Sequence, residues 1–307
     1  MLQEHAVTAA VARVTTPATQ VSFSKIMVAT DFSPASERAL KYAISIARRF
    51  RSKIYLSHVI TLDGYPMIAP EIAAKTIDAS RGEAEENFAR IVESGGLHGI
   101  EYHTNILEGA FWPTLDSLIN EYKIDLLVLG TRGLGDVKKV ILGSGAEEAF
   151  RQARIPVLTV GPHAKDEWLG KTEFKNILFA TDFGPGVDRE AAYAFALAQE
   201  HHAQITLLNV VPYVEVETFS EEAVTKQRDW VVRQLKELVP AKANLDYKPE
   251  FLMMTGDPVE EILRRADKAD LIVMGAKPRK GLAGHVPHTK AYRVISAAKC
   301  PVLTIKS

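Results

Sequence analysis

The sequence has little of what marks secreted or membrane-spanning proteins. Its 307 residues include one cysteine, Cys300, which excludes a disulfide bond within the chain and fits a reducing compartment. Cys300 adjoins an apolar segment, so we interpret it as a buried thiol rather than a reactive one. No uninterrupted apolar run of roughly 18 residues occurs, so no transmembrane helix is expected.

The sequence also lacks an excess of charge of either sign. It has 37 basic and 38 acidic residues, a formal net charge of −1, which gives no electrostatic argument for nucleic acid or a membrane surface as a partner. Residues 1–22 lack the basic start and continuous apolar run of a signal peptide. We expect a flexible N-terminal extension there and, by default, a cytoplasmic protein.

The chain contains an internal repeat. Ala-Thr-Asp-Phe occurs at residues 29–32 and again at residues 180–183, and Pro-Val-Leu-Thr followed by Val or Ile occurs at 156–160 and 301–305. Two similar units of this size indicate two domains that arose by duplication. We predict a first domain at 23–162, a polar linker at 163–173 and a second domain at 174–307.

Apolar segments rich in strand formers alternate with segments of helical spacing in both halves. Ser33 and Pro34 suit the start of the first helix, and further helices are expected at about 70–93 and 113–122 and up to residue 150. This order predicts an α/β fold of two doubly wound domains, each a five-stranded, mainly parallel sheet with helices on both faces. The expected strands are 25–30, 54–60, 102–107, 125–129 and 156–160, then 175–181, 205–211, 247–253, 271–274 and 301–305.

A glycine-rich segment follows the fourth expected strand. Gly130, two residues, Gly133, nine residues and then Gly143-Ser144 lead into the next helix. Glycines permit close approach to the backbone, and the free N–H groups of a helix start favour phosphate. The segment is neither a Walker loop nor the dinucleotide fingerprint, which follows the first strand. A glycine-rich turn without a ligand is the alternative.

With these motifs the chain from about residue 23 onward resembles a tandem universal stress protein. Gly130, Gly133, Gly143 and Ser144 match that family's ATP-binding spacing, Gly-x2-Gly-x9-Gly-[Ser/Thr]. The resemblance implies a fold like that of the adenine-nucleotide α-hydrolases. It also implies that ATP, AMP or another adenine nucleotide binds in the first domain, with Mg or Mn as an accompanying ion.

The resemblance also implies which residues contact the nucleotide. The nucleoside should face Ala29, Thr30, Asp31 and Val59. Residues around the phosphates should be Leu129, Gly130, Arg132, Gly133, Gly143, Ser144 and Gly145. The family often has a β-branched residue where this chain has Gly145, a departure that should loosen the phosphate end of the site.

The second half departs from the motif. It keeps Gly275, but Pro278 replaces the second glycine and His288-Thr289 replaces Gly-Ser. Proline has no N–H to offer a phosphate. We therefore expect at most one strong ATP site, in the first domain. A solvated basic loop explains the segment that contains Lys277, Arg279, Lys280, His285 and His288. A site for a smaller anion or for a metal is the alternative, although no cysteine or carboxylate cluster accompanies the histidines.

Three polar features have simpler explanations. Asp31 and Asp182 occupy matching positions after a strand, where an aspartate often only orders the turn. His58 matches Asn209, so we interpret it as a hydrogen-bonded residue at a strand end rather than a general base. His201-His202 is typical of a helix end, where cationic side chains suit the dipole.

The sequence therefore favours a nucleotide-binding, stress-response regulatory protein. No paired carboxylates, nucleophile with a base, or metal cage indicates fast turnover, so at most slow ATP hydrolysis is expected. The alternatives are a scaffold protein that needs no nucleotide and an ATP-using enzyme of the same superfamily. A protein partner is expected but not identified. The final strands, 157–160 and 302–305, are expected to pair within the chain as a pseudo-dimer, and further homo-oligomers are possible.

Overall fold

The computed structural model describes residues 21, 23–61, 69–131, 144–164, 173–213, 220–276 and 289–306. The predicted N-terminal extension apart from residue 21, most of the predicted linker and most of the glycine-rich segment lie outside these residues. In the described part of the chain, no helix combines the length and the apolar character that crossing a membrane requires.

The described strands form one ten-stranded sheet in the order β3-β2-β1-β4-β5-β10-β9-β6-β7-β8. Each half contributes five parallel strands, as predicted, and the halves join where β5 runs antiparallel to β10. The strands are β1 (Lys25–Ala29), β2 (Lys53–Ile60), β3 (Tyr102–Glu108), β4 (Leu126–Gly130), β5 (Val157–Val160), β6 (Asn176–Ala180), β7 (Gln204–Val211), β8 (Glu250–Thr255), β9 (Leu271–Ala276) and β10 (Val302–Lys306).

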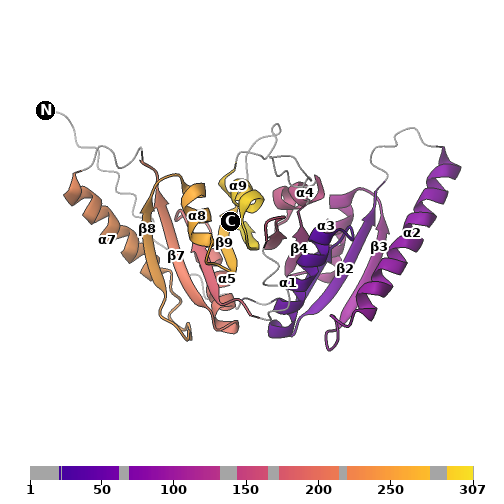
Figure 1. The fold of residues 1–307 in the computed structure, drawn as a ribbon, viewed down its shortest axis with the longest axis horizontal. Helices are drawn as coiled ribbons and strands as arrows, with labels where there is room; N and C mark the ends of the chain where they lie inside the picture. Colours follow the sequence, from indigo (N-terminus) through magenta and orange to yellow (C-terminus); the bar gives the residue numbers. More distant parts are fainter. Residues whose placement is uncertain are drawn as a thin grey trace.

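Helices cover both faces of the sheet, and each face has its own hydrophobic core. One core contains buried residues of α1, α2, α5 and α7, and the other those of α3, α4, α8 and α9. Each core runs through both halves of the chain, and α2 and α7 lie at the far ends in Figure 1. The helices are α1 (Pro34–Phe50), α2 (Pro70–Glu93), α3 (Phe111–Tyr122), α4 (Ser144–Gln152), α5 (Val187–Glu200), α7 (Glu221–Glu237), α8 (Pro258–Ala266) and α9 (Lys290–Ala297).

The start of α1 follows from its sequence. The Ser33 side chain accepts a hydrogen bond from the Ser36 N–H, and Pro34 is the first helical residue. Proline suits this position because its missing N–H would have no partner within the helix. The helix ends at Phe50 and is capped by Arg51, whose backbone is left-handed and whose N–H donates to the Ala47 carbonyl.

Several element boundaries differ from the predictions by one to three residues, among them the starts of β8 and α3. β8 begins at Glu250, which pairs with Thr206 of β7, so the predicted start at residue 247 is wrong. α3 begins at Phe111, ahead of the predicted residue 113. Pro113 lies within the first turn of α3, where its missing N–H breaks no helical hydrogen bond.

The two halves meet along β5 and β10, which confirms that the final strands pair within the chain. Thr159 Oγ1 donates to the Val302 carbonyl at 3.1 Å, and Thr304 Oγ1 donates to the Val157 carbonyl at 3.2 Å. The two threonines occupy matching positions in the repeat, so the contact has pseudo-twofold symmetry.

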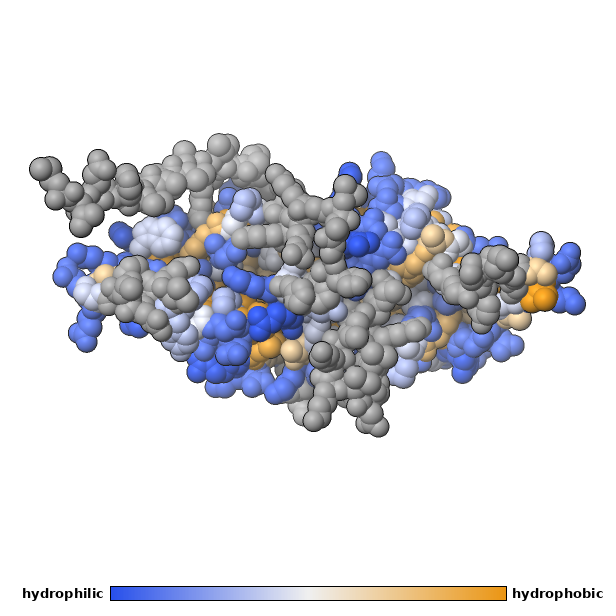
Figure 2. All heavy atoms as spheres, turned by 90° about the horizontal axis from the view of Figure 1, so that it is seen from above, coloured by the Kyte–Doolittle hydropathy of each residue, from blue (hydrophilic) through white to orange (hydrophobic). Residues whose placement is uncertain are grey.

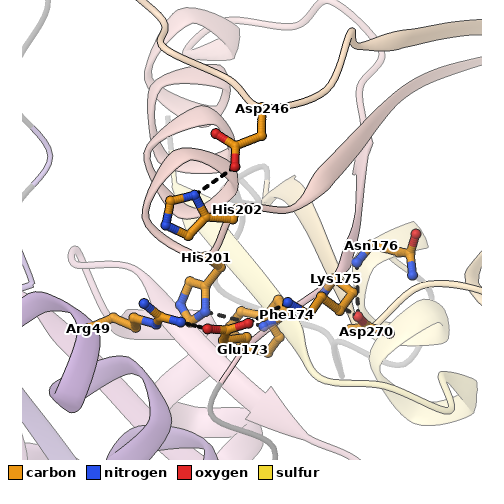
Figure 3. A network of polar contacts seen from close by, with 9 residues as sticks. All are labelled: Arg49, Glu173, Phe174, Lys175, Asn176, His201, His202, Asp246 and Asp270. Carbon is orange, nitrogen blue, oxygen red and sulfur yellow. Dashed lines mark hydrogen bonds and ion pairs between the residues drawn. The ribbon is translucent and has the colours of Figure 1, made fainter.

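A second contact between the halves lies where α1 ends. Arg49 of α1 forms an ion pair with Glu173, which precedes β6 (Figure 3). Beside this pair, Nδ1 of the fully buried His201 accepts a hydrogen bond from the Phe174 N–H at 3.2 Å. The rings of Phe50 and Phe174 lie 6.4 and 4.6 Å from that of His201, measured between centroids. His201 follows the last residue of α5, which confirms the predicted helix end, but it is buried in a packed junction, and burial lowers its pKa to about 3, so it is not the predicted cation.

Candidate functional site

The predicted site lies at the carboxyl ends of β1, β2 and β4. The chain runs outward from β1 to β2 and β3, then returns to β4 on the other side of β1. Open α/β sheets bind ligands at such a reversal of strand order. The reversal recurs in the second half at β6, between β7 and β9.

Thr30 and Asp31 form an ordered turn between β1 and α1. Thr30 Oγ1 accepts from the Phe32 N–H at 3.0 Å, and Asp31 Oδ1 accepts from the Ser33 N–H at 3.1 Å. These bonds hold Phe32 at a left-handed φ of 58°. Ser36, which the sequence did not single out, completes the turn because its Oγ accepts from Thr30 Oγ1 at 3.0 Å.

The second half contains the same turn. Thr181 Oγ1 accepts from the Phe183 N–H at 3.0 Å, Asp182 Oδ1 accepts from the Gly184 N–H at 3.1 Å, and Phe183 has a φ of 55°. The interpretation of both aspartates as residues that order the turn is therefore confirmed. Contact between Asp31 and a nucleotide stays a prediction, and the side chain of Asp31 is exposed to receive one.

His58 supports this turn from β2. Its Nδ1 lies 2.8 Å from the Thr30 carbonyl oxygen, which can only accept, so Nδ1 carries the hydrogen. In the second half Asn209 Nδ2 donates to the Thr181 carbonyl at 2.9 Å. The interpretation of His58 as a hydrogen-bonded residue at the strand end is confirmed.

Ala29 and Val59, which are predicted to face the nucleoside, lie in the same core as Leu129, which is predicted to lie near the phosphates. Ala29 is the register partner of Leu129 on the neighbouring strand. Both belong, with Val59, to the core on the α3 and α4 side of the sheet. Ala29, Val59 and Leu129 are 7%, 9% and 3% exposed, so they form the end of that core beneath the turn.

Packing within the fold explains why residue 130 is a glycine, whereas the sequence analysis explained it by contact with a ligand. A Cβ atom on Gly130 would lie 2.4 Å from the Ala35 carbonyl carbon and 2.6 Å from the Ser36 nitrogen. The backbone that approaches Gly130 closely is therefore the first turn of α1. The first turn of α1 therefore explains why a side chain is excluded at this position, and contact between the Gly130 backbone and a ligand stays a prediction.

Gly145 is explained in the same way. A Cβ atom there would lie 2.9 Å from the Phe111 ring, so the glycine lets α3 pack against the first turn of α4. Ser144 is the first residue of α4, as predicted. Arg132, Gly133 and Gly143 lie outside the described residues, and so do Pro278, His285 and His288 of the second half.

The second half differs at Glu190, which sequence reasoning missed. Glu190 lies on α5, is 6% exposed, and reaches the end of β9. A Cβ on Gly275 would lie 2.1 Å from its Oε1. The two copies of Ala-Thr-Asp-Phe could have revealed it, since continuing that alignment places Glu190 opposite Ala39. Among the described residues, no group of three or more His, Cys, Asp or Glu side chains is placed to hold a metal ion.

The fold and the site define the class of protein. This is a tandem α/β protein whose two halves share one sheet, each with an ordered Thr-Asp turn at its switch point. The model of the Universal stress protein family matches residues 22–161 and 173–306. The chain belongs to the Universal stress protein family, as its sequence motifs predicted.

Relatives support this assignment over one half and over the whole chain. A universal stress protein of Methanocaldococcus jannaschii is 30% identical over 145 residues, which is 47% of this chain and 85% of the relative. One from Mycolicibacterium smegmatis is 24% identical over 299 residues, covering 92% of this chain and 96% of the relative. The crystal structure of a universal stress protein from Archaeoglobus fulgidus has the same fold, with a TM-score of 0.68, 18% identity, and coverage of 92% of this chain and 98% of that one.

Proposed function

We propose that the first domain binds ATP or another adenine nucleotide and that the bound state regulates the interactions of this universal stress protein. The observation that carries the proposal is the position of the Thr30–Asp31 turn, Val59 and the end of β4 at one switch point, where the connection to α4 begins. That connection contains the complete Gly-x2-Gly-x9-Gly-Ser spacing. Membership of the Universal stress protein family is a further support for the proposal that the first domain binds a nucleotide.

Each group has a chemical role in this proposal. Adenine packs against the apolar ends of β1, β2 and β4, and the Asp31 carboxylate accepts from the ribose hydroxyls. The first N–H groups of α4 and the Arg132 guanidinium bind the phosphates, with Mg or Mn neutralising part of their charge. Nucleotide binding then shifts the protein toward one conformation of the surface around this end of the sheet. A partner that binds this conformation more tightly thereby distinguishes the nucleotide-bound state.

Isothermal titration calorimetry with ATP, in the presence and absence of Mn²⁺, tests the proposal. Val59→Phe places a larger side chain among the residues proposed to face adenine and should abolish the binding heat. Val210→Phe makes the same change in the second domain and should leave ATP binding intact. Thermal melting of both variants checks that they fold. Absence of heat from the unmodified protein at millimolar ATP, with and without the metal, would contradict the proposal.

A further inference from the structure

The second domain contains an open groove of about 480 Å³ between α8 and the amino ends of its strands. The first residues of β6, β7 and β8, which are Asn176, Gln204 and Glu250, all line it. The candidate nucleotide site lies at the carboxyl ends of strands in the other domain, so the groove is a separate feature. Its polar lining matches the described surface visible from above, which is mostly hydrophilic with smaller hydrophobic areas in both halves (Figure 2).

The matching place in the first domain is filled by aromatic rings. Tyr55 of β2 is 5% exposed, and its ring stacks on those of His103 and Tyr122, at centroid distances of 5.4 and 4.7 Å. Thr206 occupies the position of Tyr55, because each is the third residue of its strand. The register partner of Thr206 is Glu250, whereas that of Tyr55 is His103. The smaller threonine leaves open the space that a tyrosine fills, so the groove is specific to the second domain.

The helix side of the groove is cationic. Arg264, Arg265 and Lys268 line it from the last turn of α8 and the residues that follow. Arg264 forms an ion pair with Glu261, which compensates its charge. Among the described residues, no carboxylate forms an ion pair with Arg265 or Lys268, and the Arg265 guanidinium contacts the sulfur of Met254 at 3.6 Å. Two cationic groups are therefore available to an anion.

The strand side of the groove provides hydrogen-bond acceptors. Thr206 Oγ1 donates to Glu250 Oε2 at 3.2 Å, which leaves lone pairs on both groups. The side-chain nitrogen of Gln204 donates to two backbone carbonyls, so its side-chain oxygen remains an acceptor. Leu178 and Leu252 add apolar surface to the same side. Acceptors beside a small apolar surface suit a ligand that carries hydroxyl groups on a carbon skeleton.

The charges of the groove favour an anion even when its carboxylates are counted. The three cations of the helix side face one carboxylate in the lining, that of Glu250, and one beside it, that of Glu261. The excess is one positive charge. The nearby Asp267 carboxylate is bound by the Lys299 ammonium at 2.7 Å, so this pair adds no net charge.

We propose that this groove binds a small phosphorylated polyol, a ligand with one phosphate group, several hydroxyl groups and little apolar surface. The Arg265 guanidinium binds the phosphate through parallel N–H groups, and the Lys268 ammonium binds it as a point charge. Glu250, Thr206 and Gln204 accept from the hydroxyl groups. The volume of the groove falls within the range of small-molecule sites. This inference does not depend on ATP binding by the first domain.

Three probes test the proposal by calorimetry on the full chain: glucose 6-phosphate, glucose and inorganic phosphate. We expect saturable binding of glucose 6-phosphate, with an affinity about tenfold or more above that of either other probe, because only this probe engages both sides of the groove. No saturable binding at millimolar glucose 6-phosphate would overturn the proposal. Equal affinity for inorganic phosphate would overturn it as well, because it would show recognition of a simple anion without the polyol.

A variant that fills the groove locates the site. Thr206→Tyr introduces the side chain that the first domain has at this position and should abolish binding of glucose 6-phosphate. Val210→Phe lies at the other end of β7 and should leave it unchanged. Thermal melting checks that both variants fold. Binding that survives in a folded Thr206→Tyr variant would place the site elsewhere and overturn the proposal.

Charge variants test the phosphate contact without filling the groove. Arg265→Gln and Lys268→Gln lie at exposed positions and should each weaken binding of glucose 6-phosphate about tenfold or more. Lys123→Gln is the matched control, because Lys123 precedes Asp125 as Lys268 precedes Asp270, and both aspartates accept N–H groups where β1 and β6 begin. Equal affinity in all three variants would contradict the proposal. Because ATP is measured separately, failure here leaves the proposed function untouched.

Discussion

At the residue scale, the same side chains order the fold and face the candidate site. Asp31 and Asp182 each accept a backbone N–H two residues ahead, at 3.1 Å in both halves. The proposed nucleotide contact belongs to Asp31 alone. The repeat therefore provides an internal control that separates the structural role from the binding role.

Asp31→Ala and Asp182→Ala should each lower the free energy of unfolding by about 1 kcal/mol, because each removes one hydrogen bond that orders a turn. Only Asp31→Ala should weaken ATP binding. Urea denaturation and calorimetry on both variants measure the two effects. Equal ATP affinity in both variants would mean that Asp31 is structural only.

Gly130→Ala should destabilise the protein by roughly 2 kcal/mol, because the new Cβ meets the α1 backbone, which cannot move without disturbing the helix. Gly82→Ala is the matched control, since nothing lies within 4 Å of a Cβ there. Gly82 lies inside α2, where alanine is the better helix former, so stability should rise by up to about 1 kcal/mol. Chemical denaturation compares the two, and equal stabilities would refute the packing role of Gly130.

At the element scale, most of the secondary structure could be predicted from local signals. Continuous apolar runs indicated strands buried on both faces, and Ser33-Pro34 located the start of α1. The start of β8 was missed because only its pairing with β7 fixes where the strand begins. Gly130, Gly145 and Glu190 are explained by contacts between elements that are distant in sequence. Local sequence patterns carry no information about such contacts.

The junction of α1 with the segment before β6 should make stability depend on pH through His201. Burial, with Arg49, His202 and Lys175 nearby, lowers the pKa of His201 from 6.5 to about 3. Below pH 6.5 the His201 side chain binds a proton in the unfolded chain, whereas in the folded state it stays neutral down to about pH 3. Stability from this residue is therefore complete above pH 6.5 and falls as the pH drops toward 3.

The junction contains other charged groups besides His201. Glu173 pairs with Arg49, and the carboxylates of Asp246 and Asp270 accept from His202 and from the Lys175 N–H (Figure 3). Between pH 7.5 and 5, His201→Phe should lose about 2 kcal/mol less of its free energy of unfolding than the unmodified protein loses. His202→Gln, a change at the exposed neighbour, should lose as much as the unmodified protein. Urea denaturation at both pH values measures this, and an unchanged pH dependence in His201→Phe would contradict the assignment.

At the scale of the whole molecule, the tandem domains form one folding unit. β5 and β10 join their sheets, and both hydrophobic cores contain residues of each half. We expect a single calorimetric unfolding transition for the full chain. Thr304→Val, which removes one of the two hydroxyl bonds across the junction, should lower the temperature of that transition without splitting it. Two resolved transitions in the unmodified protein would show that the halves unfold independently.

The symmetry of the sheet contrasts with the asymmetry of the two switch points. Both halves keep the Thr-Asp turn and the strand order, while only the first keeps the glycine spacing and only the second has Glu190. The residues that the two halves share thus order the fold, and those that differ lie at the two switch points. This difference is the basis of the proposal that only the first switch point binds a nucleotide.

A crystal structure of the full chain grown with ATP and Mn²⁺ tests this proposal most directly. We expect adenine against Ala29 and Val59, the polyphosphate between Leu129 and the start of α4, and no nucleotide at the ends of β6, β7 and β9. ATP bound at the ends of β6, β7 and β9, with the first switch point empty, would contradict the proposal.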